Sequence, residues 1–300
     1  MKTLVHFLSY HLLRATCAVL IVLPLPVSYL LARTIGTVAF HVLRLRRRVV
    51  MNNLRLALGS ERGEADLKGI AAESYRQIAM SFVELLIAPK LQLHIQHMLT
   101  PEQASLIKGL LNQGKGVVLV SGHLGNWELQ GAALATIMDK PFTVAAVRQS
   151  NPYINSFITR RRNSMGMQVA GTKKAMKLLL KALNNGEAIG LVADQNAGRN
   201  AVFVNFFGKS AATQPGPAQL ALKYGAPMAV FAAIRTGPGS FKILAQQVAI
   251  RDDDTVETLT QRHVKVLESF IRLHPEQYFW LHRRWKTRPP EELKITALSP

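Results

Sequence analysis

Short apolar segments that alternate with segments of helical periodicity constrain the fold of this chain more than any other feature. Four runs rich in Val, Ile, Leu and Ala have the length and composition of buried strands: KGVVLVSG, PFTVAAVR, EAIGLVAD and APMAVFAAIR. Helical patterns lie between them, and another runs from Val256 to about Leu273, just before Pro275. Strands separated by helices of this length predict an α/β layered domain with a largely parallel central sheet flanked by helices.

The helices themselves are predicted from apolar spacing and from stop signals. Ahead of the first strand, apolar residues recur at helical spacing from Glu64 to Ile87, and Pro89 ends that helix. The segments NWELQGAALATIM, NPYINSFITRRRNSMG and KKAMKLLLKALNNG are predicted as the next helices, the last ending in an Asn-Asn-Gly stop. The chain has 300 residues, of which 48% are hydrophobic, so it is long enough to bury one large core.

The N-terminal part predicts a membrane anchor. Between Arg14 and Arg33 lie eighteen residues without a formal charge, which barely matches the thickness of a bilayer core of roughly 30 Å. Pro24 and Pro26 would kink or break a helix there, so a re-entrant or interfacial anchor is an alternative. A buried helix of a soluble protein is a weaker alternative. A cleavable signal peptide is also weaker, because no clear cleavage site follows. We divide the chain into an anchor with its basic flank, residues 1–50, and a main domain, residues 51–300.

The charge balance narrows the choice of partners. With 37 basic and 18 acidic residues, the formal net charge is +19, which predicts attraction to polyanions such as nucleic acids, anionic membranes and phosphorylated lipids. No nucleic-acid-binding module is recognisable, so we expect no nucleic acid. Four arginines between residues 44 and 48 follow the anchor, and such clusters favour the cytoplasmic face of a membrane. The single Cys17 excludes an internal disulfide and a Cys-rich metal site.

The segment SGHLGNWE, residues 121–128, carries the strongest chemical signal. It lies where the VVLV strand gives way to a helix, and active sites of α/β sheets collect at such strand ends. Asn126 is placed to cap the helix, with Glu128 in its first turn. A carboxylate that contacts one imidazole nitrogen leaves the other free to accept a hydroxyl proton, so we predict His123 as a general base oriented by Glu128.

Other interpretations of this segment are weaker. It lacks the second histidine of an HExxH zinc site, and Ser121 is not in a G-x-S-x-G elbow. A capped helix, in which His123 and Glu128 are merely satisfied polar groups, is the structural alternative.

HLGNWE resembles the H-x-x-x-x-[DE] motif of the glycerolipid and lysophospholipid acyltransferase superfamily, in the Glu form of the lipid A biosynthesis acyltransferases. Further blocks are similar to that family in order, over roughly residues 10–290: RRRVVMNNLRLAL, VRQSNPYINSFITRRR, LVADQNAGRNAVFVNFFGKSAATQPGPAQLALKYGAP and PEQYFWLHRRWKTRP. The family transfers fatty acyl groups from acyl carrier protein to hydroxyls of a phosphorylated glucosamine lipid. One departure is Gln149, where many relatives have proline, and it leaves the role of Arg148 open.

The resemblance implies roles for further polar residues. Arg160 would stabilise the oxyanion of acyl transfer, although Arg161 and Arg162 beside it leave the register open. Three arginines on a solvated helix face are the alternative. The substrate-binding residues implied by the resemblance are Arg148, Asp194, Gln195, Arg283 and Arg284.

The implied donor is an acyl carrier protein thioester, and the implied acceptor is a phosphorylated glycolipid, namely a lipid A precursor. No metal and no cofactor is expected. The resemblance places the protein at the bacterial inner membrane, with residues 51–300 as a catalytic domain on the cytoplasmic side. An acyltransferase for another lysolipid or glycolipid is the nearest alternative, and a non-catalytic membrane-bound lipid-binding protein is a weaker one.

Overall fold

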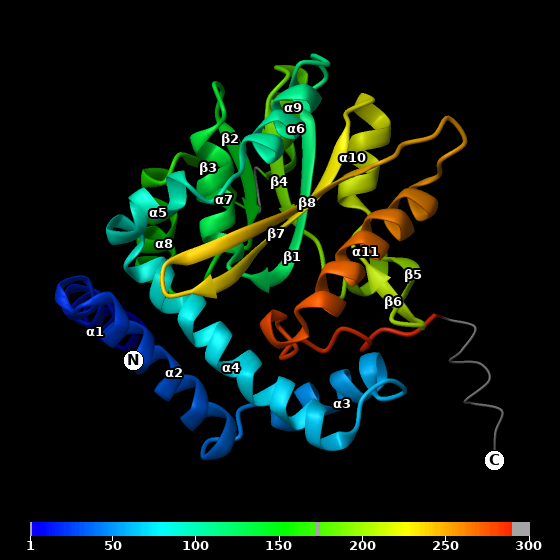
Figure 1. Cartoon of the computed structure of the whole chain (residues 1–300). Helices are drawn as coiled ribbons and strands as arrows, with labels where there is room; N and C mark the ends of the chain where they lie inside the picture. Colours follow the sequence, from blue (N-terminus) through cyan, green and yellow to red (C-terminus); the bar gives the residue numbers. More distant parts are fainter. Residues whose placement is uncertain (1, 172–174, 290–300) are drawn as a thin grey trace.

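A six-stranded sheet organises the molecule (Figure 1), and the computed structural model describes residues 2–171 and 175–289. The strands lie in the order β3-β2-β4-β1-β7-β8, with the bounds β1 Val117–Gly125, β2 Phe142–Ala146, β3 Met167–Gly171, β4 Ala188–Val192, β7 Met228–Gly237 and β8 Ser240–Val248. Neighbouring strands are parallel except β7 and β8, which are antiparallel. The prediction of an α/β domain with a largely parallel sheet is confirmed.

Helices precede the sheet and pack on both of its faces (Figure 1). In chain order they are α1 Lys2–Val22, α2 Leu25–His41, α3 Arg47–Leu58, α4 Glu64–Leu86, α5 Gln92–Gln96, α6 Pro101–Leu111, α7 Trp127–Thr136, α8 Pro152–Ser164, α9 Ala175–Asn184, α10 Gly216–Tyr224 and α11 Val256–Leu273. Short 3₁₀ turns lie at Ala88–Leu91, Gly198–Asn200 and Pro275–Gln277. A separate hairpin of β5 Val202–Phe206 and β6 Lys209–Thr213 packs against α11.

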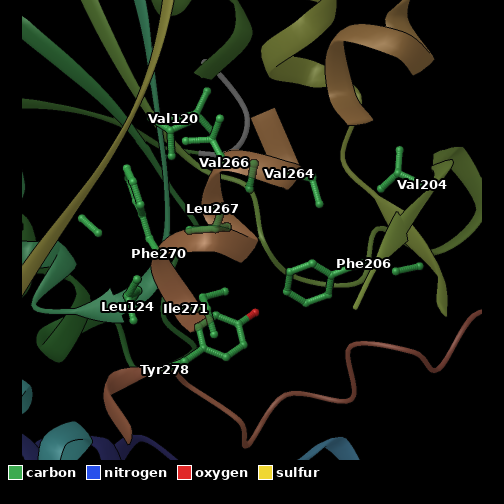
Figure 2. Packing of buried hydrophobic residues seen from close by; sticks show 14 of the residues in the cluster. Val120, Leu124, Val204, Phe206, Val264, Val266, Leu267, Phe270, Ile271 and Tyr278 are labelled. Atoms are coloured by element: carbon green, nitrogen blue, oxygen red, sulfur yellow. The ribbon is translucent and has the colours of Figure 1, made fainter. Parts of the chain in front are cut away.

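The central strand β1 feeds two hydrophobic clusters, one on each face of the sheet. Because side chains alternate along a strand, Val118 and Val120 point into one cluster and Val117 and Leu119 into the other. Figure 2 shows the first cluster, where side chains of α11 pack against the end of β1: Leu267, Phe270 and Ile271 lie near Leu124 and Tyr278. Both faces of β1 are therefore buried, as its unbroken apolar run predicts.

Most of the predicted elements are present, but several elements lacked a clear pattern in the sequence. The helix predicted over 64–87 is α4, the helix from Val256 to Leu273 is α11, and the four predicted strands are β1, β2, β4 and β7. Residues 173–174 of the predicted basic helix lie outside the described residues. The strand β8 was not predicted, because this edge strand is only partly buried and its sequence, SFKILAQQV, has little apolar periodicity.

The N-terminal apolar region forms two helices instead of one. The uncharged run is divided at Pro24, the residue directly before α2. Proline ends the first helix there, and a second helix begins. Of these, α1 is long and apolar enough to cross a membrane, and only 11% of its apolar window is buried. The second helix packs on α4, where Gly36 is essential for close approach, since a Cβ there would lie 2.5 Å from Arg76 Cα. The boundary we placed at residue 50 stays a prediction, and it falls inside α3.

Candidate active site

The end of β1 leaves the regular sheet and forms a bulge that carries His123. Ser121 lies opposite Phe231 of β7, and Gly125 lies opposite Ala233, so four steps along β1 match two along β7. Gly125 closes the bulge with φ of +60°, and a Cβ there would lie 1.9 Å from the Ala233 carbonyl oxygen. Bulges beside active sites redirect side chains, and this one turns His123 out of the sheet.

Asp194 holds the His123 imidazole in one orientation. Asp194 follows β4, the parallel neighbour of β1, so both residues reach the same edge of the sheet. One carboxylate oxygen accepts the His123 backbone N–H at 2.8 Å, and the other lies 2.7 Å from Nδ1. The Asp194 side chain is buried, with 3% exposed, whereas 22% of the imidazole stays exposed. Nδ1 is therefore assigned the proton, and Nε2 is left as an acceptor.

The carboxylate of Asp194 makes the His123 imidazole more basic. Burial lowers the pKa of His123, but the Asp194 carboxylate, with a smaller contribution from Glu128, outweighs burial and raises that pKa above its usual value. Burial opposes ionisation of Asp194, yet the charge and hydrogen bonds of His123 keep the Asp194 pKa below its usual value. Asp194 therefore stays ionised beside a histidine of raised basicity.

The predicted contact between the Glu128 carboxylate and the His123 imidazole is not formed in the described structure. Asn126 caps α7 as predicted, accepting the N–H groups of Glu128 and Leu129 at 3.0 and 2.9 Å, and Glu128 lies in the first turn. Its carboxylate, however, binds Arg162 of α8 through two hydrogen bonds of 2.8 and 2.6 Å. The helix turns Glu128 toward α8, so the orienting place belongs to Asp194, which is 71 residues away in sequence.

Arg160, the predicted oxyanion arginine, does not line the cavity beside His123, whereas Arg162 does. Arg160 is exposed and hydrogen-bonds Ser156 of its own helix at 2.6 Å. Arg161 donates to the Leu86 carbonyl oxygen at 3.2 Å, whereas Arg162 reaches Glu128 and lines the cavity described below. Residues two apart on a helix point in different directions, so only one of these arginines can face the site.

The remaining predicted substrate residues are divided by the structure. Gln195 lines the cavity, whereas Arg148 and Arg283 are exposed and do not line it. Arg284 is buried and donates to the Ala212 carbonyl oxygen and the Thr213 hydroxyl at 2.6 and 2.5 Å. Arg284 thus joins the C-terminal segment to β6, and the prediction that it is a substrate-binding residue is withdrawn.

Two aromatic residues that the sequence analysis did not assign to the site flank the imidazole. The ring centroids of Trp127 and Phe279 lie 4.8 and 5.7 Å from that of His123. The Phe279 N–H also donates to the His123 carbonyl oxygen at 2.9 Å, which ties the C-terminal segment to the bulge. Trp127 lies between Asn126 and Glu128, so its position inside the motif could have indicated that it belongs to the site. No such indication exists in the sequence for Phe279, because only the folded chain brings it near His123.

A cavity of about 440 Å³ opens beside His123. Its polar wall is formed by His123, Glu128, Arg162, Gln195, Asn196 and Gln214. Its other wall is apolar and is formed by the buried side chains of Leu119, Leu134, Phe142 and Met167. Gly131 and Gly190 keep this part open, since a Cβ at either position would lie 2.6 Å from Met167 Sδ or from Phe142 Cζ, respectively. The site thus joins a basic nitrogen and a guanidinium to an apolar slot.

The chain matches the family described as bacterial lipid A biosynthesis acyltransferase over residues 1–287. It is 30% identical to the lipid A biosynthesis lauroyltransferase of Escherichia coli (strain K12), an alignment that covers 89% of this chain and 88% of that protein. It is 28% identical to the lipid A biosynthesis palmitoleoyltransferase of the same organism, over 91% and 89%. A phosphatidylinositol mannoside acyltransferase of Mycolicibacterium smegmatis is 27% identical over 58% of each chain. This protein belongs to the bacterial lipid A biosynthesis acyltransferase family, and it is an acyltransferase.

Proposed function

We propose that the protein transfers a fatty acyl chain from an acyl carrier protein thioester to a hydroxyl of a lipid A precursor, with His123 as general base. One observation carries this proposal: Asp194 engages Nδ1 of His123, while Nε2 is left to accept a proton beside a cavity with an apolar slot. The names of the relatives support lipid A as the acceptor class. The related phosphatidylinositol mannoside acyltransferases make another glycolipid the alternative acceptor.

The proposed reaction is a direct transfer. Nε2 of His123 accepts the proton of the acceptor hydroxyl, and the oxygen attacks the thioester carbonyl carbon. The resulting tetrahedral oxyanion collapses, the C–S bond breaks, and the protonated imidazole returns the proton to the leaving thiolate. The products are an ester and the free thiol of the carrier. Asp194 acts as a positioning residue that holds the tautomer and stabilises the imidazolium.

Arg162 replaces Arg160 in our assignment of the oxyanion donor. Glu128 accepts hydrogen bonds from Nε and Nη2 of the Arg162 guanidinium, and this two-point contact fixes the orientation of the planar group. Arg162 lines the cavity, and its third nitrogen, Nη1, is not used by Glu128. A donor held in advance stabilises developing charge without reorganising during the reaction. This gives Glu128 a role through Arg162, in addition to its electrostatic effect on His123.

The apolar slot is proposed to hold the acyl chain. Leu119, Leu134, Phe142 and Met167 give the slot a buried apolar wall, which suits a hydrocarbon chain better than a charged headgroup. The buried polar residues Ser121 and Gln130 also line the cavity, and the Ser121 hydroxyl donates to the Gln130 side-chain oxygen at 3.2 Å. The thioester carbonyl would then lie at the polar end, near His123 and Arg162. Met167, which lines this apolar wall, would then limit the length of chain that fits.

Membrane attachment at the cytoplasmic face of the inner membrane is proposed from two surfaces. Large apolar side chains are exposed along α1, such as Leu4, Leu8 and Leu12 at 57–70% exposure. A cleft of about 810 Å³ beyond α2 is lined by the arginines of residues 44–48 together with Arg55 and Lys68, and the carboxylate of Glu64, which also lines it, is paired with Arg55. The apolar helix α1 at one end of α2 and the basic cleft at the other suit the core and the anionic headgroups of a leaflet (Figure 1).

The experiment that tests the function is incubation of purified protein with an acyl carrier protein thioester and a lipid A precursor, followed by mass spectrometry of the lipids. The expected product carries one additional acyl ester. Transfer only to a different lysolipid or glycolipid would retain the acyltransferase and overturn the proposed acceptor.

His123→Ala is expected to reduce kcat by about 10²–10⁴-fold while the protein stays folded, because general-base assistance is lost. Asp194→Asn should reduce kcat by about 100-fold or more, since an amide does not impose the same tautomer. The base must be neutral, so wild-type activity falls as pH falls through the raised pKa of His123. Without the carboxylate, this acid limb should move to lower pH. Substantial activity in His123→Ala, or an acylated protein that later passes its chain to acceptor, would contradict the mechanism.

Arg162→Ala is expected to lower kcat on the order of 100-fold, with a much smaller effect on KM, because an oxyanion donor acts in the transition state. Arg160→Ala is the matched control: it is the same change, two residues away, on an exposed side chain that hydrogen-bonds Ser156 of its own helix. It should retain activity close to wild type. Steady-state kinetics of both variants decide the register, and the opposite ranking would restore Arg160.

Met167→Ala is expected to shift the preferred acyl donor toward longer chains, and Gly131→Ala toward shorter ones, because the new Cβ pushes the Met167 thioether into the slot. A methylene that no longer fits should cost about 10-fold or more in kcat/KM. Met165→Ala, which lines a different cavity, is the control and should leave the preference unchanged. Competition among carrier thioesters of different chain lengths measures the effect. An unchanged preference in both slot variants would place the chain elsewhere.

The full-length protein is expected to stay in the membrane fraction at about 1 M salt, because screening removes only the contribution of the arginines and not that of the exposed apolar helix. Detergent should release it. Sedimentation of membranes after each wash, followed by immunodetection, measures the distribution. Quantitative release by salt alone would exclude an embedded α1.

A further inference from the structure

A fully buried ion pair lies behind the bulge that carries His123. Glu84 of α4 has no exposed surface, and the side chain of Arg235 on β7 is 3% exposed. The Arg235 guanidinium donates to both Glu84 oxygens through Nε and Nη2, at 2.6 Å for Nε, and its remaining N–H groups reach Ser81 and Gln77. The charges are thus paired in two places and further hydrogen-bonded, which is the arrangement that buried charges require.

The pair is connected directly to the catalytic turn. The Asn126 side-chain amide donates to Glu84 Oε2 at 2.5 Å, while its carbonyl oxygen caps α7. Next to it, the Ser81 hydroxyl donates to the Gly125 carbonyl oxygen at 3.0 Å, and the Asn126 N–H donates to the Ala233 carbonyl oxygen at 2.8 Å. The end of the bulge and the start of α7 are therefore fixed to α4 on one side and to β7 on the other.

The pair also reaches the N-terminal helices. The Tyr29 hydroxyl of α2 donates to Glu84 Oε1 at 2.5 Å and accepts the Gly239 N–H at 2.8 Å, at the tip of the β7–β8 hairpin. Tyr29 itself is buried, with 4% exposed. A single carboxylate thus receives hydrogen bonds from α2, from β7 and from the cap of α7.

Stability alone does not account for this arrangement. Burying two charges costs desolvation free energy, and well-packed apolar residues of similar size are often at least as stabilising as a buried ion pair. Apolar residues do not fix the orientation of a neighbouring polar group. Hydrogen bonds do, and here they fix the orientation and position of a capping amide. The partner oriented in this way is Asn126, between His123 and Glu128 in sequence.

We propose that Glu84 and Arg235 are positioning residues of the acyltransferase, which act through Asn126 to hold His123 and the Glu128–Arg162 pair in register and which couple this register to α2 through Tyr29. The inference rests on the proposed role of His123. The ion pair touches neither the cavity nor the imidazole, so its effect on the reaction is indirect.

The test changes the contacts around the ion pair, because removal of Glu84 would leave the buried Arg235 without a compensating negative charge and is expected to prevent folding. Asn126→Ser keeps an oxygen that caps α7 but removes the amide that reaches Glu84, so it separates the two tasks of this residue. We expect kcat to fall by about 10- to 100-fold, with KM for donor and acceptor unchanged, since small displacements of reacting groups have effects of this size.

Tyr29→Phe and Tyr75→Phe form a matched pair for the coupling to α2. Both phenols are on buried tyrosines with 4% exposure, but the Tyr75 hydroxyl donates to the Leu45 carbonyl oxygen and does not reach Glu84. Tyr29→Phe should lower kcat, and Tyr75→Phe should not. Asn126→Ser combined with Tyr29→Phe should lower kcat by less than the product of the two single effects, because both act through Glu84.

A measurement without substrate keeps this inference separate from the proposed function. The pH dependence of His123 modification by diethyl pyrocarbonate, followed by peptide mass spectrometry, reports the imidazole directly. In Asn126→Ser its midpoint should move to lower pH, because Glu128, which helps to raise the His123 pKa, shifts with the first turn of α7. Tyr75→Phe should leave the midpoint unchanged.

If wild type fails to acylate lipid A precursors, the proposed acceptor is wrong, while this midpoint still decides the inference. A folded Asn126→Ser protein with wild-type kcat and wild-type midpoint would overturn it, as would equal losses of kcat in Tyr29→Phe and Tyr75→Phe.

Discussion

The parallel pairing of β1 with β4, together with the bulge in the pairing of β1 with β7, is the constraint on which the rest of the site depends. Parallel neighbours bring their carboxyl ends to one edge, so Asp194 after β4 meets His123 after the regular part of β1. The bulge adds residues between two fixed pairings with β7, and these residues have no partner on β7. Leu124 pairs instead with Tyr278 of the C-terminal segment. His123 consequently leaves the sheet, and its backbone N–H finds Asp194 instead of a strand partner. One carboxylate therefore satisfies the bulged backbone and orients the imidazole.

Two carboxylates with separate partners define the electrostatics of the site. Asp194 is held by His123, and Glu128 is held by Arg162, so each negative charge is compensated locally in a chain whose net charge is +19. As a result, an imidazole of raised pKa and a guanidinium line the same cavity, each held by its own carboxylate. If Glu128 contacted the imidazole directly, Arg162 would lose the partner that fixes its fork. The arrangement thus assigns one carboxylate to the base and the other to the cation.

The N-terminal helices belong to the same body as the catalytic residues. Helix α2 packs along α4 with a glycine at the closest approach, and α1 contacts α8, where the Asn151 amide donates to the His6 carbonyl oxygen at 2.9 Å. Helix α8 carries Arg162, and α4 carries Glu84. These contacts hold the cavity at a fixed position relative to the exposed apolar surface of α1. If α1 anchors the protein as we propose, this geometry would suit the proposed reaction between a soluble carrier and an acceptor that stays in a leaflet.

The sequence by itself determined the alternation of buried strands and helices, the cap at Asn126 and the place of His123 at a strand end, because these follow from local periodicity and local hydrogen bonding. It did not determine which carboxylate meets the imidazole. Glu128 is five positions away and Asp194 is 71, and the near one was predicted, yet a helix turns the near side chain toward α8 while strand order brings the distant one into contact. The choice among Arg160, Arg161 and Arg162 was equally undecided, since the three consecutive residues are identical. Only the contact of Arg162 with Glu128 of α7 shows which of them lines the cavity. The buried partners Glu84 and Arg235 gave no signal, because their pairing joins α4 to β7 across 151 residues and exists only in the folded chain.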